Sequence, residues 1–464
     1  MDRISIESIV EATGGALMRK SSENFITGVK HDSRECSKGD MFVAVVGENH
    51  DGHDYLRQVL ENGCKTVLVS CDESALRCIG DMEANVIKVK DTVYAMGELA
   101  KYYLDTLAAV KIAVTGSVGK TSTRDMIYYA LGEKHVCGRN MKNYNNDIGL
   151  PLSVFQFDSR MDAVVLEMGM DHSGEIERLS EIVRPNIAVI TNIGTSHIEN
   201  LGSREEIFRA KMEITKYMEP YGKNKSTLIF PTDDEFLTKK RTAGDYEQVT
   251  IGRNGKSDYI ISDIDDFGLD GIKFTLEYQH ESRTVNIPVP GRHSAVNGTI
   301  AIAVCGILGM SMDDAIKGLA ETQLTGNRLR HLKNGRLSVI DDTYNASPDS
   351  MKSALTVLNK SRCRGKKTAI LGDMYELGKQ SERQHFGIGV FARGLDLDRI
   401  IAVGEKSRAI AEGAKGGKAQ VLYFKTKDEL YREIKELASA GDMILVKGSR
   451  GMGMEEIVDK LLDI

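Results

Sequence analysis

The stretch Val114-Thr115-Gly116-Ser117-Val118-Gly119-Lys120-Thr121-Ser122 decides the fold. The apolar segment 111–115 leads into this stretch and overlaps its first two residues. A segment with helical periodicity follows and ends at Leu131. Glycines let backbone N–H groups turn toward a phosphate, and the N-terminus of the following helix adds its dipole. A lysine at this place reaches the β- and γ-phosphates, and the next hydroxyl reaches Mg²⁺. The stretch therefore predicts a strand, a phosphate-binding loop and a helix.

This loop is shorter than the general phosphate-loop pattern. That pattern has a glycine five residues before Gly119, where this chain has Val114. The shortened form reads T-G-x-x-G-K-T. The alternative is a glycine-rich turn with an incidental lysine, and the strand and helix on either side favour the phosphate loop.

Two further apolar segments place polar residues at strand ends. Residues 163–167 end on Glu167, and residues 187–192 are followed by His197. An ATPase of this type needs a carboxylate for Mg²⁺ at the end of a neighbouring strand, and Glu167 fits that need. The alternative for Glu167 is a surface carboxylate. A histidine such as His197 ligates a metal or hydrogen-bonds within its loop, and taken alone the loop interpretation is favoured.

Composition sets the size and class of the molecule. At about 150 residues per domain, 464 residues predict three domains. A net charge of −6 argues against a surface built for nucleic acid or anionic membranes. The longest apolar stretch, Ile300–Met310, falls short of the roughly 20 residues of a membrane helix. With no signal peptide at the N-terminus, we expect a cytoplasmic protein.

The chain divides into three α/β units. Residues 1–88 predict a small mixed domain, and residues 89–324 predict a parallel sheet that contains the phosphate loop. Within the second unit, polarity alternates between Gln248 and Pro290 with glycine turns, which predicts antiparallel strands at a sheet edge or in a side layer. Residues 325–464 predict a second doubly wound, Rossmann-like domain. Its expected strands are Leu337–Ile340, Thr368–Leu371, Ile400–Val403, Val421–Phe424 and Met443–Val446.

Several segments together resemble one family, the Mur ligases, which are ATP-dependent amide-forming enzymes of peptidoglycan synthesis. The resemblance covers essentially the whole chain. The segments that carry it in the last two units are Thr115–Thr121, Glu167-Met168-Gly169, Asn192–His197, Arg209–Ile214, His293–Asn297, Gly326–Arg328 and Asp342–Pro348.

The resemblance implies a role for each matching residue. Catalytic roles fall to Lys120, Glu167, His197, Lys211 and Arg328. ATP contacts fall to residues 115–122, with Asn297 at adenine, Arg328 at the γ-phosphate and Asp342 at the ribose. Thr121, Glu167 and His197 would hold Mg²⁺, and a carbamylated Lys211 would help to organise a second ion. The alternative for Lys211 is an ordinary helix lysine.

Three segments resemble the branch of this family that adds D-Ala-D-Ala: Asn143–Pro151, Leu371–Gly378 and Lys447–Glu455. Asp32-Ser33-Arg34 and Asn49–His53 resemble its UDP-binding elements. The substrate contacts implied are Ser33, Arg34, His50, Asp51, Gly52, Asn145, Asn146, Asn345, Asp373, Ser449 and Arg450.

The resemblance implies a monomeric ligase that uses ATP and Mg²⁺. It would join D-Ala-D-Ala to the C-terminal carboxylate of UDP-N-acetylmuramoyl-tripeptide through an acyl phosphate. Each of the three units would then bind one ligand: the UDP substrate, ATP and the dipeptide.

Three other classes of protein share some of these features. Folyl- and other polyglutamate-type ligases share the short loop and the metal strand but lack the Asn143–Pro151 segment. A dinucleotide-binding oxidoreductase would need G-x-G-x-x-G, whereas Gly448–Gly453 reads G-x-x-G-x-G. A non-enzymatic nucleotide switch would have no use for the Asn145-Asn146 loop.

Overall fold

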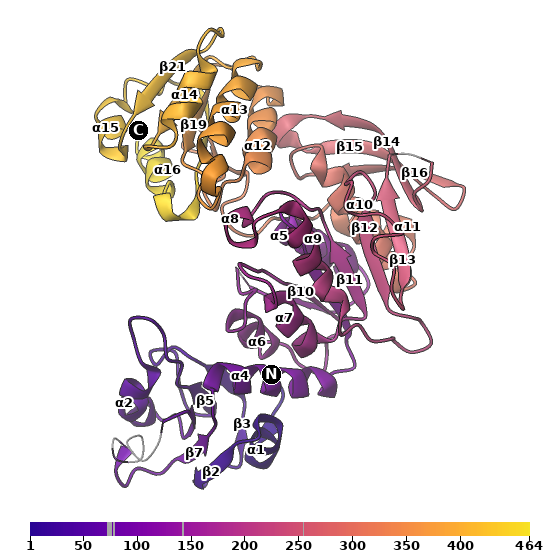
Figure 1. Cartoon of the computed structure of the whole chain (residues 1–464), viewed down its shortest axis with the longest axis vertical. Helices are drawn as coiled ribbons and strands as arrows, with labels where there is room; N and C mark the ends of the chain where they lie inside the picture. The colour runs from indigo at the N-terminus through magenta and orange to yellow at the C-terminus, as the bar shows by residue number, and fades with distance from the viewer. Residues whose placement is uncertain (72–76, 78, 142, 254) are drawn as a thin grey trace.

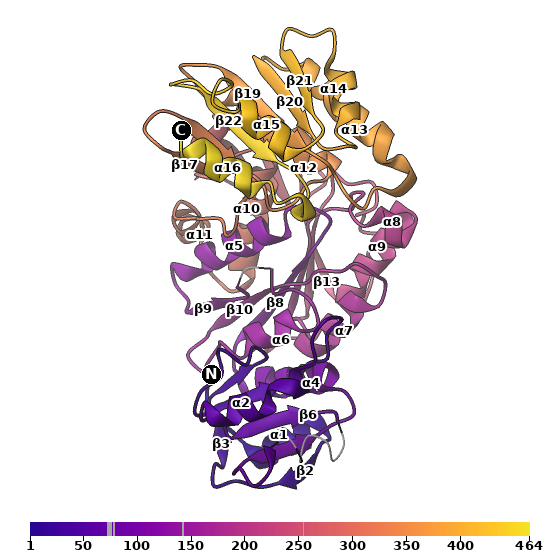
Figure 2. The ribbon, with the colours of Figure 1, turned by 90° about the vertical axis from the view of Figure 1, so that its left-hand side faces the viewer.

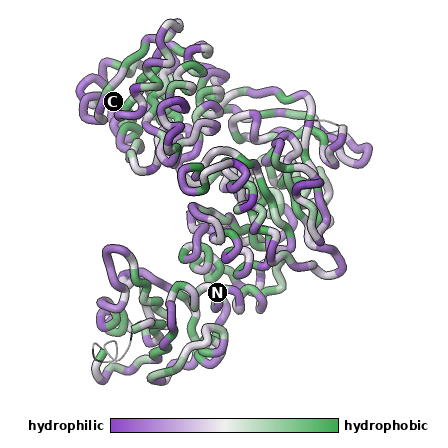
Figure 3. The backbone as a smooth tube through the Cα atoms, viewed as in Figure 1, coloured by the Kyte–Doolittle hydropathy of each residue, from purple (hydrophilic) through white to green (hydrophobic). Residues whose placement is uncertain are grey.

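The computed structural model describes residues 1–71, 77, 79–141, 143–253 and 255–464. Three α/β units follow one another along the long axis, each built on its own sheet (Figures 1 and 2). The apolar segments lie inside the sheets and on the helix faces that cover them (Figure 3). This architecture confirms the predicted α/β class. None of the described helices combines the length and apolar character needed to cross a membrane.

The N-terminal unit has a five-stranded sheet in the order β2-β7-β6-β5-β4. Its strands are β2 (Ala16–Arg19), β4 (Gly28–Lys30), β5 (Asp40–Val43), β6 (Thr66–Val69) and β7 (Asn85–Lys88). Only β2 runs antiparallel to its neighbour. The remaining elements are β1 (Ile4–Ser5) paired with β3 (Phe25–Ile26), α1 (Ile6–Thr13), the 3-10 turn η1 (Gly52–Tyr55) and α2 (Leu56–Glu61). The helix α4 (Thr92–Thr106) leads into the central unit.

The central unit has a nine-stranded sheet in the order β16-β15-β14-β13-β12-β11-β8-β10-β9. Its strands are β8 (Val110–Thr115), β9 (Cys137–Arg139), β10 (Ala163–Glu167), β11 (Ile187–Ile190), β12 (Thr227–Pro231), β13 (Glu247–Gly252), β14 (Tyr259–Asp266), β15 (Ile272–Tyr278) and β16 (Glu281–Ile287). Strands β8, β10, β11 and β12 are buried throughout, as expected for a parallel sheet covered on both faces.

One expectation for this sheet was partly wrong. Residues 248–290 do form its edge, but β13 runs parallel to both β12 and β14, and only β14, β15 and β16 pair antiparallel. Alternating polarity reports that one face of a strand is buried. It does not report the direction of the neighbouring strand, which depends on the connection between them.

Helices cover both faces of the central sheet. The first group is α5 (Lys120–Gly132), α10 (His293–Ile307) and α11 (Met312–Leu319), which share one core with β8 and β11. The second group includes α4 and α7 (Glu175–Val183), which share the opposite core. The shorter elements are α6 (Gly149–Val154), α8 (Ile198–Leu201), α9 (Arg204–Met212), η2 (Glu213–Thr215) and η3 (Gly268–Asp270).

The C-terminal unit has a six-stranded sheet in the order β17-β18-β22-β19-β20-β21, parallel except for the edge strand β17. Its strands are β17 (Arg330–Lys333), β18 (Ser338–Asp341), β19 (Lys367–Gly372), β20 (Arg399–Val403), β21 (Gln420–Phe424) and β22 (Met443–Lys447). One face is covered by α12 (Pro348–Lys360), α13 (Ser381–Arg393) and α14 (Arg408–Ala414). The other is covered by α15 (Lys427–Glu433) and α16 (Glu455–Leu462), with η4 (Gly378–Gln380) and η5 (Arg450–Met452) in the loops. Helices on both faces make this unit doubly wound, as expected.

One buried hydroxyl ties the first two units together. Tyr103 of α4 is 1 % exposed, donates to Phe157 O at 2.8 Å and accepts from Asp2 N at 2.8 Å. Tyr103→Phe should therefore cost about 1–3 kcal/mol of unfolding free energy, because two backbone groups lose a partner. Tyr102→Phe, 37 % exposed on the same helix, is the control. Equal midpoints of thermal unfolding for the two variants would contradict this prediction.

Candidate active site

The loop between β8 and α5 needs glycine at two positions, Gly116 and Gly119. Gly116 has φ +148°, and a Cβ there would lie 1.9 Å from Thr191 Oγ1. Gly119 has φ +87° and is the N-cap of α5. A glycine cap has no side chain to satisfy the first amides of α5. Among the described residues, no side chain caps the start of α5, and such an uncapped helix N-terminus is the arrangement that binds a phosphate.

The end of β11 holds this loop in place. Thr191 Oγ1 and Asn192 Nδ2 donate to Val118 O at 2.6 and 2.7 Å. Asn192 Oδ1 accepts from Val118 N at 3.0 Å, and Asn192 O accepts from Ser117 N at 3.1 Å. The loop is thus fixed by the neighbouring strand, and Asn192 has a structural role here.

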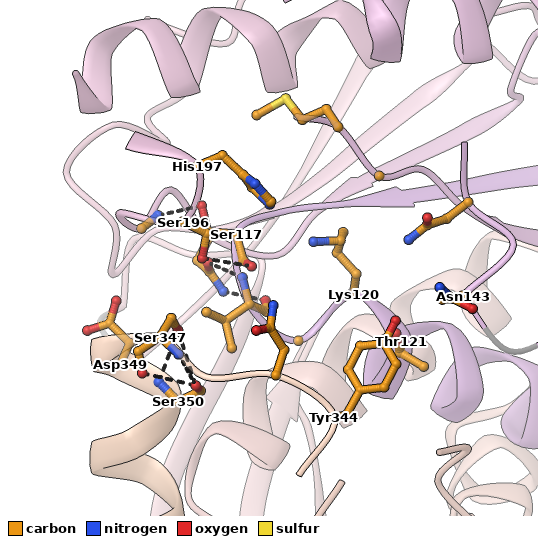
Figure 4. A pocket seen from close by; sticks show the side chains of 18 of the residues that line it. Ser117, Lys120, Thr121, Asn143, Ser196, His197, Tyr344, Ser347, Asp349 and Ser350 are labelled. Carbon is orange, nitrogen blue, oxygen red and sulfur yellow. Dashed lines mark hydrogen bonds between the residues drawn. The ribbon is translucent and has the colours of Figure 1, made fainter. Parts of the chain in front are cut away.

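Lys120 lies at the centre of the site. Its Nζ donates to Gly116 O at 2.8 Å, and Figure 4 shows the side chain projecting into the pocket on the same side as His197. Burial lowers the pKa of Lys120, the Glu167 carboxylate opposes that shift, and the Arg328 guanidinium adds to it. Two cations from different units therefore face one region, where an anion would relieve their repulsion.

Glu167 is the buried carboxylate of this site. It is 2 % exposed at the end of β10, where Thr121 Oγ1 donates to Oε2 at 2.6 Å and Asn145 Nδ2 to Oε1 at 2.8 Å. Asn140 holds the strand end through Glu167 N and O. The structure thus brings Thr121 and Glu167 together as expected, and Asn145 meets the carboxylate directly.

His197 lies in the same cleft, but its nearest polar neighbours are not Thr121 and Glu167. Its Nδ1 is 3.1 Å from Asp171 Oδ1 and 2.8 Å from Glu376 Oε2. Contact with His197 lowers the pKa of Glu376, which belongs to the C-terminal unit. His197, Asp171 and Glu376 form a group whose ligand atoms all lie within 4.8 Å of one another. The contact between His197 and Glu376 therefore spans the second and third units.

Lys211 is buried in α9 with 1 % of its surface exposed. Burial lowers its pKa well below the usual value, and the charge on Lys120 adds to this. Among the described residues, no carboxylate pairs with its Nζ. Lys211 is therefore a buried amine that faces another cation.

Arg328 and Asp342 lie where the third unit begins. The Arg328 guanidinium stacks 3.9 Å above the Tyr344 ring. Asp342 Oδ2 pairs with Lys447 Nζ at 2.6 Å, and Oδ1 accepts from Leu329 N at 3.1 Å. Both carboxylate oxygens of Asp342 thus have partners within the chain.

One cleft of about 1290 Å³ gathers most of the expected nucleotide and catalytic residues. Asn297 lines it, 5 % exposed and 3.4 Å from the place of a Cβ on Gly119, and its buried Nδ2 has no hydrogen-bond partner among the described residues. The other expected residues on its wall are Ser117, Val118, Gly119, Lys120, Thr121, Ser122, Asn145, Asn146, Glu167, His197, Arg328, Asp342, Asn345, Ser449 and Arg450. Thr115, Gly116, Lys211 and Asp373 are not on the wall.

The expected UDP contacts lie apart from this cleft, in the N-terminal unit. Arg34 pairs with Asp32 through Nε and Nη2, at 2.9 and 2.6 Å, so its guanidinium already has an anionic partner. Asp51 Oδ1 accepts from His53 N and Nδ1. Gly52 passes so close to Val45 that a Cβ would lie 2.7 Å from Val45 N. Ser33 is buried and His50 exposed.

The expected dipeptide contacts are held by hydrogen bonds within the third unit. Asp373 Oδ1 accepts from Ser407 N and Oγ, each at 2.7 Å. Ser449 Oγ accepts from Tyr375 N, and Asn345 Oδ1 accepts from Ala346 N. In the central unit, Asn146 Oδ1 similarly accepts from Gly149 N at the start of α6.

Sequence reasoning missed three residues that shape the site. Asn140 fixes the end of β10, Lys447 pairs with Asp342, and Arg124 Nη1 lies 3.6 Å from Glu167 Oε2. Lys447 opens the segment Lys447–Glu455 and directly follows an apolar segment, so its position at a predicted strand end was a usable signal. Arg124 lies four residues after Lys120 on the same helix, and this spacing was the only other signal.

Comparison with known proteins decides the family. Three models match: the Mur ligase family catalytic domain over residues 25–104, the Mur ligase middle domain over 114–305, and the Mur ligase, glutamate ligase domain over 327–450. A Bacillus subtilis (strain 168) protein named UDP-N-acetylmuramoyl-tripeptide–D-alanyl-D-alanine ligase is 38% identical, covering 100% of this chain and 99% of that protein. The chain belongs to the Mur ligase family.

Solved structures of Mur ligases share the whole fold. MurF from Acinetobacter baumannii matches with a TM-score of 0.90 at 32% identity, covering 100% of both chains. MurF ligase from Thermotoga maritima in complex with ADP matches with a TM-score of 0.80 at 26% identity, covering 94% of this chain and 97% of that one. This Mur ligase is therefore similar to MurF proteins over its full length.

The Gly116 geometry gives a test of the loop. Gly116→Ala should destabilise the protein by about 2–4 kcal/mol, because the new methyl collides with Thr191. Gly132→Ala is the matched control, since a Cβ there meets nothing within 4 Å. We expect a lower thermal midpoint for Gly116→Ala alone. Wild-type stability in that variant would show that the loop is not packed against β11 as described.

Proposed function

We propose that this Mur ligase joins D-Ala-D-Ala to the C-terminal carboxylate of UDP-N-acetylmuramoyl-tripeptide, with ATP converted to ADP and phosphate. The product would be UDP-N-acetylmuramoyl-pentapeptide, a precursor of peptidoglycan. The observation that carries the proposal is a single cleft that joins the phosphate loop of the second unit to Arg328 and Asp342 of the third. The 38% identity to the Bacillus subtilis ligase supplies the substrate class.

The reaction needs an activated carboxylate, because joining a carboxylate to an amine in water is uphill. The γ-phosphoryl group would pass from ATP to the tripeptide carboxylate and form an acyl phosphate. The amine of D-Ala-D-Ala would then attack the carbonyl carbon, forming the amide and releasing phosphate. Phosphoryl transfer depends mainly on positioning and charge neutralisation.

The chain supplies positive charge where the anions meet. The free amides at the start of α5 would cradle the phosphates, Lys120 would neutralise the β- and γ-phosphates, and Arg328 would reach the γ-phosphate from the third unit. Bringing a carboxylate to a polyphosphate is strongly unfavourable without such cations. Asn297 would bind adenine, and its buried Nδ2, which has no hydrogen-bond partner among the described residues, supports this role.

The donor set at Thr121 and Glu167 fits Mg²⁺. A hydroxyl and a carboxylate oxygen only 2.6 Å apart offer the hard oxygen ligands that this ion prefers. Mg²⁺ would neutralise phosphate charge when bound. His197 would join this set through Nε2, because its Nδ1 lies within 3.1 Å of Asp171 and Glu376.

The proposal assigns the three units to three ligands. Residues 1–88 would bind the UDP moiety, with Ser33, Arg34 and the loop of His50, Asp51 and Gly52 as contacts. Residues 89–324 would bind ATP, and residues 325–464 would bind D-Ala-D-Ala, with Asn345, Asp373, Ser449 and Arg450 as contacts. Asn145 and Asn146 would meet the tripeptide. We further propose a monomer in the cytoplasm.

Phosphate release tests the function directly. Release from ATP should require both UDP-N-acetylmuramoyl-tripeptide and D-Ala-D-Ala, because each completes one step of the reaction. Lys120→Ala should reduce turnover by at least about 10³-fold, since an interior cation of phosphoryl transfer is lost. Lys134→Ala, at a half-exposed lysine beyond α5, should leave turnover unchanged. Phosphate release of the same rate without either substrate would contradict the ligase assignment.

Carbamylation of Lys211 gives a separate test. A buried amine with a lowered pKa is uncharged more often and can attack CO₂, losing a proton and gaining a carboxylate. With ¹³C-bicarbonate, NMR should show a carbamate signal in the wild type and none in Lys211→Ala. The same spectrum in both proteins would leave Lys211 as an ordinary buried lysine.

A further inference from the structure

Two buried charges on α5 have no part in the proposal above. Arg124 and Asp125 stand on the second turn of the helix that begins with Lys120, and both are 0 % exposed. Burying a charged side chain is costly unless it is paired. The hydrogen-bond partners of Arg124 and Asp125 therefore indicate which parts of the chain these two residues hold together.

Asp125 connects the phosphate-loop helix to the start of the third unit. Its Oδ2 accepts from Thr325 N at 2.7 Å and from Thr325 Oγ1 at 2.8 Å. Its Oδ1 accepts from Arg124 Nη2 at 2.6 Å and Arg139 Nη1 at 2.8 Å. Every oxygen of the carboxylate is therefore used, and one of them is used only by Thr325 among the described residues.

Arg124 links the same threonine to the candidate metal carboxylate. Its Nη2 donates to Thr325 Oγ1, and its Nη1 lies 3.6 Å from Glu167 Oε2. The Thr325 hydroxyl thus donates to Asp125 and accepts from Arg124. Valine has the same shape but can do neither, and serine can do both.

Thr325 lies just before the residue proposed to reach the γ-phosphate. Arg328 follows three positions later, and its Nη1 lies 3.4 Å from Thr325 O. Gly326, directly after Thr325, has φ +79°, and Leu329, directly after Arg328, has φ +49°. Left-handed backbone at a leucine is uncommon, so this segment holds a defined, bent path.

We propose that Asp125 is a positioning residue that, with Arg124, clamps Thr325 to the phosphate-loop helix. The clamp would fix the root of the segment carrying Arg328 relative to Lys120, so that both cations meet the same phosphate. Its catalytic consequence rests on the function proposed above. The physical clamp itself does not.

The sharpest test compares Thr325→Val with Thr325→Ser. Misplacing a catalytic group by about 1 Å can cost about 100-fold in rate. We expect Thr325→Val to lower kcat at least about 10-fold, with KM for ATP changed less than about threefold. Thr325→Ser, which keeps the hydroxyl, should stay within about twofold of the wild type. A structural role alone would lower the thermal midpoint and leave kcat per folded molecule unchanged, and that result would overturn the proposal.

A double-mutant cycle identifies the partner. If Thr325 acts through Asp125, Thr325→Val should cost much less in an Asp125→Asn background than in the wild type. Additive losses would show that the two residues act separately and would overturn the clamp. Should Asp125→Asn fail to fold, the valine and serine pair still decides.

Limited proteolysis without ligands separates the clamp from the reaction. Thr325→Val should be cleaved faster between residues 321 and 329 than either the wild type or Thr325→Ser. Thr325→Val could be cleaved faster while the wild type shows no substrate-dependent phosphate release. That pair of results would refute the proposed function and support the clamp. Equal cleavage of all three proteins would refute the clamp, even where the ligase activity is confirmed.

Discussion

The cleft depends on one constraint: β8 lies between β10 and β11 with all three strands parallel. In this register Glu167 stands opposite Val114, and Ile190 stands opposite Thr115. Three strands therefore end at one edge, where the loop after β8 binds the loop after β11 and the carboxylate of β10 meets Thr121. A slip by one residue would turn the Glu167 side chain to the opposite face of the sheet and away from Thr121, so the site requires this register.

The sequence predicted this edge well because its signals are local. The phosphate loop, the strand ending on Glu167 and the helix after Lys120 each depend on residues within one short stretch, and each stands where it was expected. The Rossmann-like third unit was also predicted, since its apolar segments read as buried strands. Edge elements were harder. The direction of β13 and the short strands β9 and β17 depend on neighbours far along the chain.

Side-chain partners were the least predictable part, because they too depend on residues far apart in the sequence. Asp125 and Thr325 are 200 residues apart, and Lys447 is 105 residues from Asp342. No local pattern marks such a pair, because the contact exists only once two units have packed. The pairing of His197 with Glu376 across units is a further example. The metal role expected of His197 came from the resemblance and stays a prediction, whereas its contact with Glu376 depends on how the two units pack.

The hinge between the second and third units has tethers at both ends. Thr325 is bound to Asp125 on the central side, and Leu329 N is bound to Asp342 on the C-terminal side. On the C-terminal side Asn327 is held as well, because its O accepts from Tyr344 N at 3.2 Å and its Nδ2 donates to Thr343 Oγ1 at 3.3 Å. A rotation of the third unit that keeps these bonds would therefore be absorbed mainly at Gly326, which has φ +79° and no side chain to restrict it. Since Arg328 stacks on Tyr344 of the third unit, such a rotation would move this cation relative to Lys120, and the proposed phosphate site depends on the angle between the units.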